Sequence, residues 1–98
     1  MNYKLFWTDA TLAENYQNEQ DFIDTMRRDG VEVEITANDG EWYDYEATYS
    51  FEADSDKKAL EHIKDFDFNG RNVDVFTLSE GKREVATEEN LEQKENRL

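Results

Sequence analysis

The stretch VEVEITANDGEWYDYEATYSFEA, residues 31–53, decides the fold. Apolar and polar residues alternate on both sides of Asn38-Asp39-Gly40, a tripeptide typical of the tight turn between two strands. In both arms the odd-numbered positions are mostly apolar, and the even-numbered positions other than Trp42 are polar or acidic. A period of two residues indicates strands. The stretch therefore predicts a long β-hairpin with one apolar face and one acidic face.

Upstream of the hairpin, the sequence predicts a further strand and a helix. Residues 3–8 alternate and carry an aromatic residue on each face, which indicates a strand in the middle of a sheet. Residues 9–17 leave two interpretations open. A helix could begin at the capping-box pair Thr11–Glu14, or the stretch is a loop before a helix over 19–29 that Asn18 caps.

Downstream of the hairpin, a second helix and a last strand are predicted. Apolar residues recur at helical spacing from a cap at Asp54 or Ser55 to about Phe66. Asn69-Gly70 is typical of a turn, and residues 72–78 have the composition of a strand.

The element order is therefore β-α-β-β-α-β, which predicts an α+β fold of the ferredoxin-like sandwich type. Because such crossovers are right-handed, both helices should cover one face of a four-stranded antiparallel sheet. The acidic side of the hairpin would then lie on the open face. We predict a single domain over 1–83 and a charged C-terminal tail over 84–98, helical or disordered, whose only large apolar residues are Val85, Leu91 and Leu98.

Charge is the most informative property of the composition. The 98 residues hold 25 Asp and Glu against 11 Lys and Arg, which gives a net charge of -14. Aromatic residues make up 13%, which favours a folded core over a disordered acidic chain. The charge argues against direct binding to nucleic acid, whose phosphates attract Lys and Arg, and against anionic membranes. Basic protein surfaces and cations remain as partners.

The sequence also limits the chemistry and the location of the protein. It contains no Cys, which excludes disulfides, thiolate catalysis and Cys-ligated zinc. No apolar run approaches the roughly 18 residues of a membrane span, and residues 1–8 do not resemble a signal peptide. We therefore expect a cytoplasmic protein, in the host cytoplasm if it is encoded by a phage.

The acids of the hairpin region form the candidate site. From Asp29 to Asp56 the chain carries ten carboxylates and no Lys or Arg. Because residues two apart on a strand share a face about 6.6–6.8 Å apart, these acids would form anionic rows beside Trp42. Such rows imitate a nucleic-acid backbone, although acids also simply solvate the outer face of a sheet. The candidate partner-binding residues are Glu32, Glu34, Asp39, Glu41, Trp42, Asp44, Glu46 and Glu52.

A weaker motif lies between the second helix and the last strand. Asp65, Asp67 and Asn69, followed by Gly70, match the first half of an EF-hand calcium loop. The second half fails, since position twelve is Phe76 where a bidentate Glu is required. These oxygen ligands make a weak candidate metal site, and we expect no cofactor.

Catalytic signals are poor throughout the chain. His62 is the only His and lies near Lys58 and Asp65 at helical spacing, as a surface or partly packed residue would. The Ser residues lack a nucleophile motif such as G-x-S-x-G, and there is no phosphate-binding loop. We predict that the protein is not an enzyme.

In overall profile the chain resembles small phage-encoded inhibitors, namely the anti-CRISPR and antirestriction proteins that mimic DNA. The most specific residues of this likeness are the hairpin acids Glu32, Glu34, Asp44 and Glu46 with Trp42. The likeness is one of composition and carries no residue-by-residue roles. It implies a non-catalytic inhibitor that binds a basic surface of a nucleic-acid-binding enzyme or ribonucleoprotein, as a monomer or small homo-oligomer.

Other functions fit the same sequence. An immunity or antitoxin-type protein that caps a nuclease toxin would use the same acidic surface with a dedicated partner. A calcium-binding module would use the Asp65 motif, and a structural phage subunit would assemble through the hairpin edge. Adaptation of an acidic protein to high salt is a further alternative.

Overall fold

The computed structural model confirms the predicted hairpin. Its arms are β2 (Val31–Asn38) and β3 (Trp42–Glu52), which pair antiparallel with Val33 opposite Ala47. Most apolar positions face the core, with Val31, Tyr45 and Ala47 buried, and the acids between them are exposed. Ala37 is the exception: it is exposed and lies opposite Asp44, because a register shift after Ile35 reverses the alternation. The hairpin therefore has the apolar face and the acidic face that the alternating sequence predicts.

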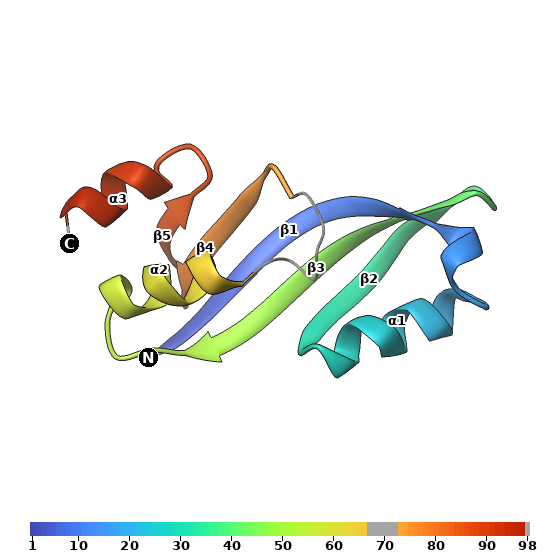
Figure 1. Ribbon diagram of the computed structural model, residues 1–98, viewed down its shortest axis with the longest axis horizontal. Coiled ribbons are helices and arrows are strands. Elements are labelled where there is room, and N and C mark those ends of the chain that lie inside the picture. The colour runs from blue at the N-terminus through green and yellow to red at the C-terminus, as the bar shows by residue number, and fades with distance from the viewer. Residues whose placement is uncertain (67–72, 98) are drawn as a thin grey trace.

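The hairpin belongs to a five-stranded antiparallel sheet with the strand order β2-β3-β1-β4-β5 (Figure 1). The outer strands on the other side are β4 (Phe76–Glu80) and β5 (Arg83–Thr87). As predicted, β1 (Asn2–Leu12) is central, between β3 and β4. The α+β class with two main helices is confirmed, and the sheet has five strands where four were expected, because β5 adds a strand beside β4.

The structure decides between the two interpretations of residues 9–17. The strand β1 continues to Leu12, so no helix begins at Thr11, whose side chain is buried in the strand pairing with β3. A short 3-10 turn (Ala13–Asn15) precedes α1 (Glu19–Arg28). The Asn18 side chain caps α1 by accepting a hydrogen bond from the Asp21 N–H at 2.9 Å.

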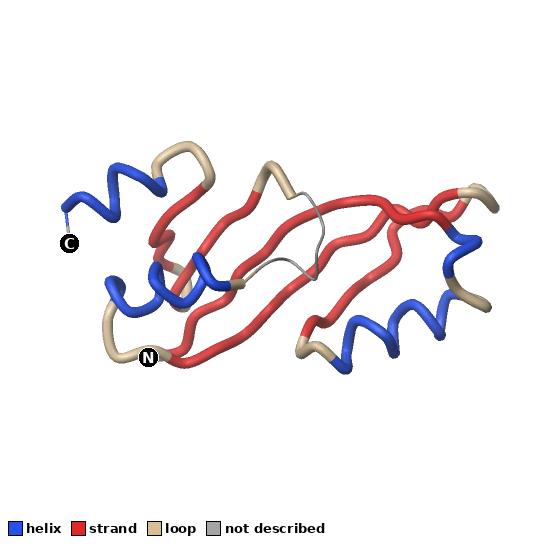
Figure 2. Tube along the Cα trace, in the orientation of Figure 1, coloured by secondary structure: helices blue, strands red, loops and turns tan. Residues whose placement is uncertain are grey.

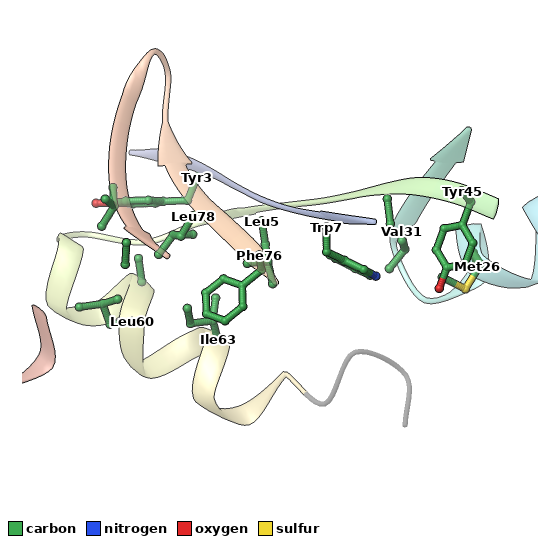
Figure 3. Packing of buried hydrophobic residues seen from close by; sticks show 14 of the residues in the cluster. Tyr3, Leu5, Trp7, Met26, Val31, Tyr45, Leu60, Ile63, Phe76 and Leu78 are labelled. Carbon is green, nitrogen blue, oxygen red and sulfur yellow. The ribbon is translucent and has the colours of Figure 1, made fainter. Parts of the chain in front are cut away.

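Across the residues that the structure describes, 1–66 and 73–97, the two main helices lie on the same side of the sheet at opposite ends of a long molecule (Figures 1 and 2). Its extents are 44 × 23 × 23 Å. The second helix, α2 (Asp56–Asp65), is capped by Ser55, as the sequence predicts. Trp7 lies between the core groups beneath the two helices (Figure 3).

The last predicted strand begins later than expected. Phe76 starts β4 and is buried with Leu78, whereas the Val75 side chain is 61% exposed and lies outside the strand. The predicted range 72–78 therefore began too early. In a strand, Val73 and Val75 would face one side of the sheet and Phe76 and Leu78 the other, so the alternation alone does not show where the strand begins. The predicted turn at Asn69-Gly70 lies outside the described residues.

The segment from Glu84 onwards begins inside a strand. Val85 and Ala86 of β5 are buried in the core, and the chain ends in α3 (Leu91–Arg97). A division at residue 84 therefore cuts through β5, so the strand is part of the domain and only α3 follows it as a helical tail. The sequence offers little sign of this, because five residues with one large apolar side chain resemble a charged linker.

A polar cluster fixes β5 to the start of α2. Arg83 donates two hydrogen bonds to the Asp56 carboxylate, at 2.8 and 2.9 Å, and one to Glu80 at 2.9 Å. The Tyr3 hydroxyl donates to the same Asp56 carboxylate at 2.7 Å. The Arg83 bonds hold the pKa of Asp56 down at about 2, and burial together with the Asp56 bond raises the pKa of Tyr3 to about 12.

The Asp56→Asn variant is expected to be less stable than the wild type at neutral pH and to approach it near pH 2. A depressed carboxyl pKa contributes stability that is complete above the ordinary Asp pKa of about 3.9 and is lost as the pH falls through about 2. The difference in unfolding free energy should be about 1–2 kcal/mol, a modest value because partly exposed pairs are screened by solvent. Urea unfolding at several pH values measures it.

The control for this experiment is Asp54→Asn, which removes an exposed carboxylate two residues away. It should show no comparable trend with pH. An Asp56→Asn deficit that stays constant down to pH 2 would show that Asp56 acts through packing and not through its charge.

Candidate protein-binding face

The candidate site lies on the side of the sheet opposite α1 and α2, which we call the open face. It presents the even-numbered residues of β1 and β3 together with Glu32 and Glu34 of β2. Within the described parts of the chain, no helix lies across this face of the sheet (Figure 1). Antiparallel sheets commonly leave one face to solvent in this way.

Four carboxylates gather at the hairpin side of the open face and form the acidic patch: Glu32, Glu34, Asp44 and Glu46. All four residues are exposed. Glu34 is the register partner of Glu46, and residues directly opposite each other across two strands have Cβ atoms about 4.5–5.5 Å apart. The patch therefore places two like charges face to face, which opposes folding.

One cation does reach the acidic patch, from outside the stretch between Asp29 and Asp56 that carries no Lys or Arg. Arg27, in the last turn of α1, donates hydrogen bonds from Nε and Nη2 to the Glu32 carboxylate at 3.1 and 3.3 Å. In the described residues, the carboxylates of Glu34, Asp44 and Glu46 form no ion pair. The uncompensated charge therefore lies on these three residues.

The Glu46→Gln variant is expected to be more stable than the wild type at low salt, by about 0.5 kcal/mol, because it removes the repulsion from Glu34. The gain should shrink as added salt screens the charges. Urea unfolding at low and high salt measures both effects. The matched control is Glu52→Gln, on the same strand but opposite the uncharged Asn2, and an equal gain there would contradict the cross-strand explanation.

Two of the predicted residues at the hairpin tip have a local structural role. The Asp39 carboxylate accepts hydrogen bonds from the N–H groups of Trp42 and Glu41, at 2.7 and 2.9 Å, and these bonds lower the pKa of Asp39. The Glu41 carbonyl accepts a bond from the Ala13 N–H at 2.8 Å, which ties the tip to the end of β1. The Glu41 side chain remains exposed. Asp39 therefore shapes the turn.

The remaining two predicted residues lie at opposite ends of β3. Trp42 is 42% exposed and pairs with Leu12 of β1, close to the acidic patch. Glu52 lies ten residues further along the strand, which is roughly 33 Å away at the rise of a β-strand. It borders a separate shallow pocket with Met1, Ala53, Asp54, Lys58 and His62. The eight predicted residues therefore do not all lie close together.

His62 is packed against aromatic rings. Its ring stacks on Phe51 with centroids 4.3 Å apart and 9° between the planes, and its Nε2 lies 2.8 Å from the Tyr49 hydroxyl. Over residues 1–66 and 73–97, no group of three or more His, Cys, Asp and Glu side chains could hold a metal ion. Asp65 is exposed at the end of α2, and the other members of the calcium motif, Asp67 and Asn69, lie outside the described residues.

The sequence prediction placed an aromatic residue on each face of this strand but did not include Phe6 among the candidate binding residues. Phe6 is 40% exposed and lies between Thr48 of β3 and Thr77 of β4. This row continues to Glu32 on one side and to Thr87 on the other, so it crosses all five strands. Phe6 alternates along the strand with buried residues and is two positions from both Lys4 and Thr8, which are exposed. Because residues two apart on a strand share a face, this spacing is the sequence signal that identifies the face of Phe6.

The comparisons with known proteins give no relative for this chain: no protein-family model, no curated protein and no solved structure matches it. In the described part of the chain, none of the helices has the length and apolar character needed to cross a membrane.

Proposed function

We propose that this protein binds, without catalysis, a basic surface by which a partner protein normally holds nucleic acid. The observation that carries the proposal is the pairing of Glu34 with Glu46, next to Asp44, on a sheet face that the described helices leave uncovered. A repulsive arrangement that opposes folding is readily explained if a partner supplies the missing cations.

The electrostatics of the acidic patch support this class of partner. A surface with concentrated negative charge attracts a basic cleft over a long range and accelerates association. Such binding weakens with salt, as the binding of nucleic acid to the same cleft does. The protein would therefore inhibit a nucleic-acid enzyme by occupying its binding surface, in the manner of anti-CRISPR and antirestriction inhibitors.

An inhibition assay tests the proposal. The purified protein is added to restriction endonucleases, RNA-guided nucleases and toxin nucleases, and DNA or RNA cleavage is followed at low and moderate salt. We expect at least one enzyme to be inhibited, with the inhibition relieved by excess non-cleavable nucleic acid. Inhibition confined to one toxin nuclease would favour the immunity-type alternative. An absence of binding to every basic enzyme at low salt would contradict the proposal.

A further inference from the structure

The open face carries apolar anchors as well as charge. Four large apolar side chains are exposed in the described structure, and two of them, Phe6 and Trp42, lie on this face. Phe6 is flanked by threonines on β3 and β4, and Trp42 lies beside Leu12. Exposed aromatic residues grouped on one face are typical of interaction surfaces.

Three of the apolar side chains on this face lie along β1, with the exposed Thr8 between the first two, and a fourth lies beside them on β3. We call them the apolar strip: Phe6, Ala10, Leu12 and Trp42. Leu12 lies six positions after Phe6, so the strip is roughly 20 Å long at the rise of a β-strand. The acidic patch runs beside it on β2 and β3. The open face therefore offers an apolar line with negative charge along one flank.

We infer that the apolar strip binds an amphipathic α-helix of the partner protein, with Lys or Arg along the flank that faces the acidic patch. The length of the strip matches about 14 helical residues at 1.5 Å per residue. The inference rests on the proposed function, since it specifies which element of a basic partner occupies the open face. Apolar contact would fix the helix, and charge would fix its orientation.

Charge and edge structure exclude the other occupants of this region. A second copy of the chain stacked on the open face would bring Glu34, Asp44 and Glu46 against their own counterparts. Strand addition at β2 would meet a β-bulge between Ile35 and Ala37 and a charged edge, features that block such pairing. The sheet already packs helices on its inner face, so a partner helix would complete a third layer.

Two synthetic peptides of about 14 residues test the inference. Both peptides have the same composition of leucine, lysine and arginine. In the first, the leucines recur at helical spacing and form one apolar face, and in the second the order is shuffled so that no apolar face forms. Trp42 is 42% exposed and Trp7 is 1% exposed, so a change in tryptophan emission reports contact at the strip. We expect the helical peptide to bind about tenfold tighter than the shuffled one.

Substitutions then locate the contact. Phe6→Ser should abolish the preference for the helical peptide. Trp42→Ser should do the same, and because it removes the fluorescent reporter, its binding is measured by calorimetry. Val75→Ser removes an apolar side chain outside the strip that is more exposed than Phe6 or Trp42, and it should leave the preference intact. Equal binding of the two peptides to the wild type, or no binding of either, would overturn the inference. If both peptides bind equally and Glu34→Lys with Glu46→Lys removes that binding, the proposed function survives alone.

Discussion

Reversing the charge of Glu34 and Glu46 to lysine should weaken binding of the inhibited nuclease by about 100-fold or more at low salt. The two residues are opposite each other, exposed and without an ion pair in the described structure. The double variant exchanges attraction for repulsion at the centre of the acidic patch, and a like charge at an interface costs several kcal/mol. Calorimetry or association kinetics against that enzyme measures the loss.

The matched control is the double variant Glu89→Lys with Glu92→Lys. It changes the net charge by the same amount at exposed positions around the start of α3, away from the open face. It should lower affinity by less than about tenfold, through long-range attraction alone. An equal loss from both pairs would show that the partner senses only the total charge of the protein.

The hairpin reversal also permits a check on folding. Two lysines at positions 34 and 46 keep like charges in register, so the cross-strand repulsion is retained and the unfolding free energy should change little. A single reversal at Glu34 instead creates an opposite-charge pair with Glu46, which should stabilise the hairpin by about 0.5 kcal/mol. If these reversals lower the affinity for the partner while the unfolding free energy stays constant or rises, the loss of binding cannot be a consequence of unfolding.

The hairpin could be predicted because its information is local. Period-two alternation and a turn tripeptide within residues 31–53 predict both strands and the side that most residues face. The exception is Ala37, which follows the bulge after Ile35 and lies opposite Asp44, exposed. The strand β5 could not be predicted in this way. Its five residues carry only one large apolar side chain, and its pairing with β4 contains a register shift that interrupts the alternation. Its contact with α2, from Arg83 to Asp56, joins residues far apart in sequence that no window of local periodicity contains.

The candidate site shows the same division. Parity correctly places Glu34, Asp44 and Glu46 on one exposed face. The alternation shows which face a residue occupies but not how far apart two residues on that face lie. It therefore also included Glu52, which lies at the other end of β3. Nor does the alternation show which carboxylates already accept hydrogen bonds within the protein, as that of Asp39 does from the N–H groups of its turn.

Truncation of the chain after Lys82 is expected to unfold the protein or reduce its stability by about 4 kcal/mol. The truncation removes the buried Val85 and Ala86, whose transfer from water contributes about 2–3 kcal/mol. It also removes Arg83, which leaves the partly buried Asp56 carboxylate without its cation. Because a domain of this size is stable by only about 5–15 kcal/mol, thermal unfolding should show a greatly lowered Tm or no transition.

Truncation after Asn90 provides the contrast, because it removes only α3. This chain keeps β5, the Arg83–Asp56 pair and the Asn90 side chain that accepts the Thr87 N–H at 2.7 Å. It should remain folded, with a small loss from the partly buried Leu91. If the chain ending at Lys82 were as stable as the one ending at Asn90, β5 would be dispensable. The domain would then end where the composition changes, and the sheet would need only four strands.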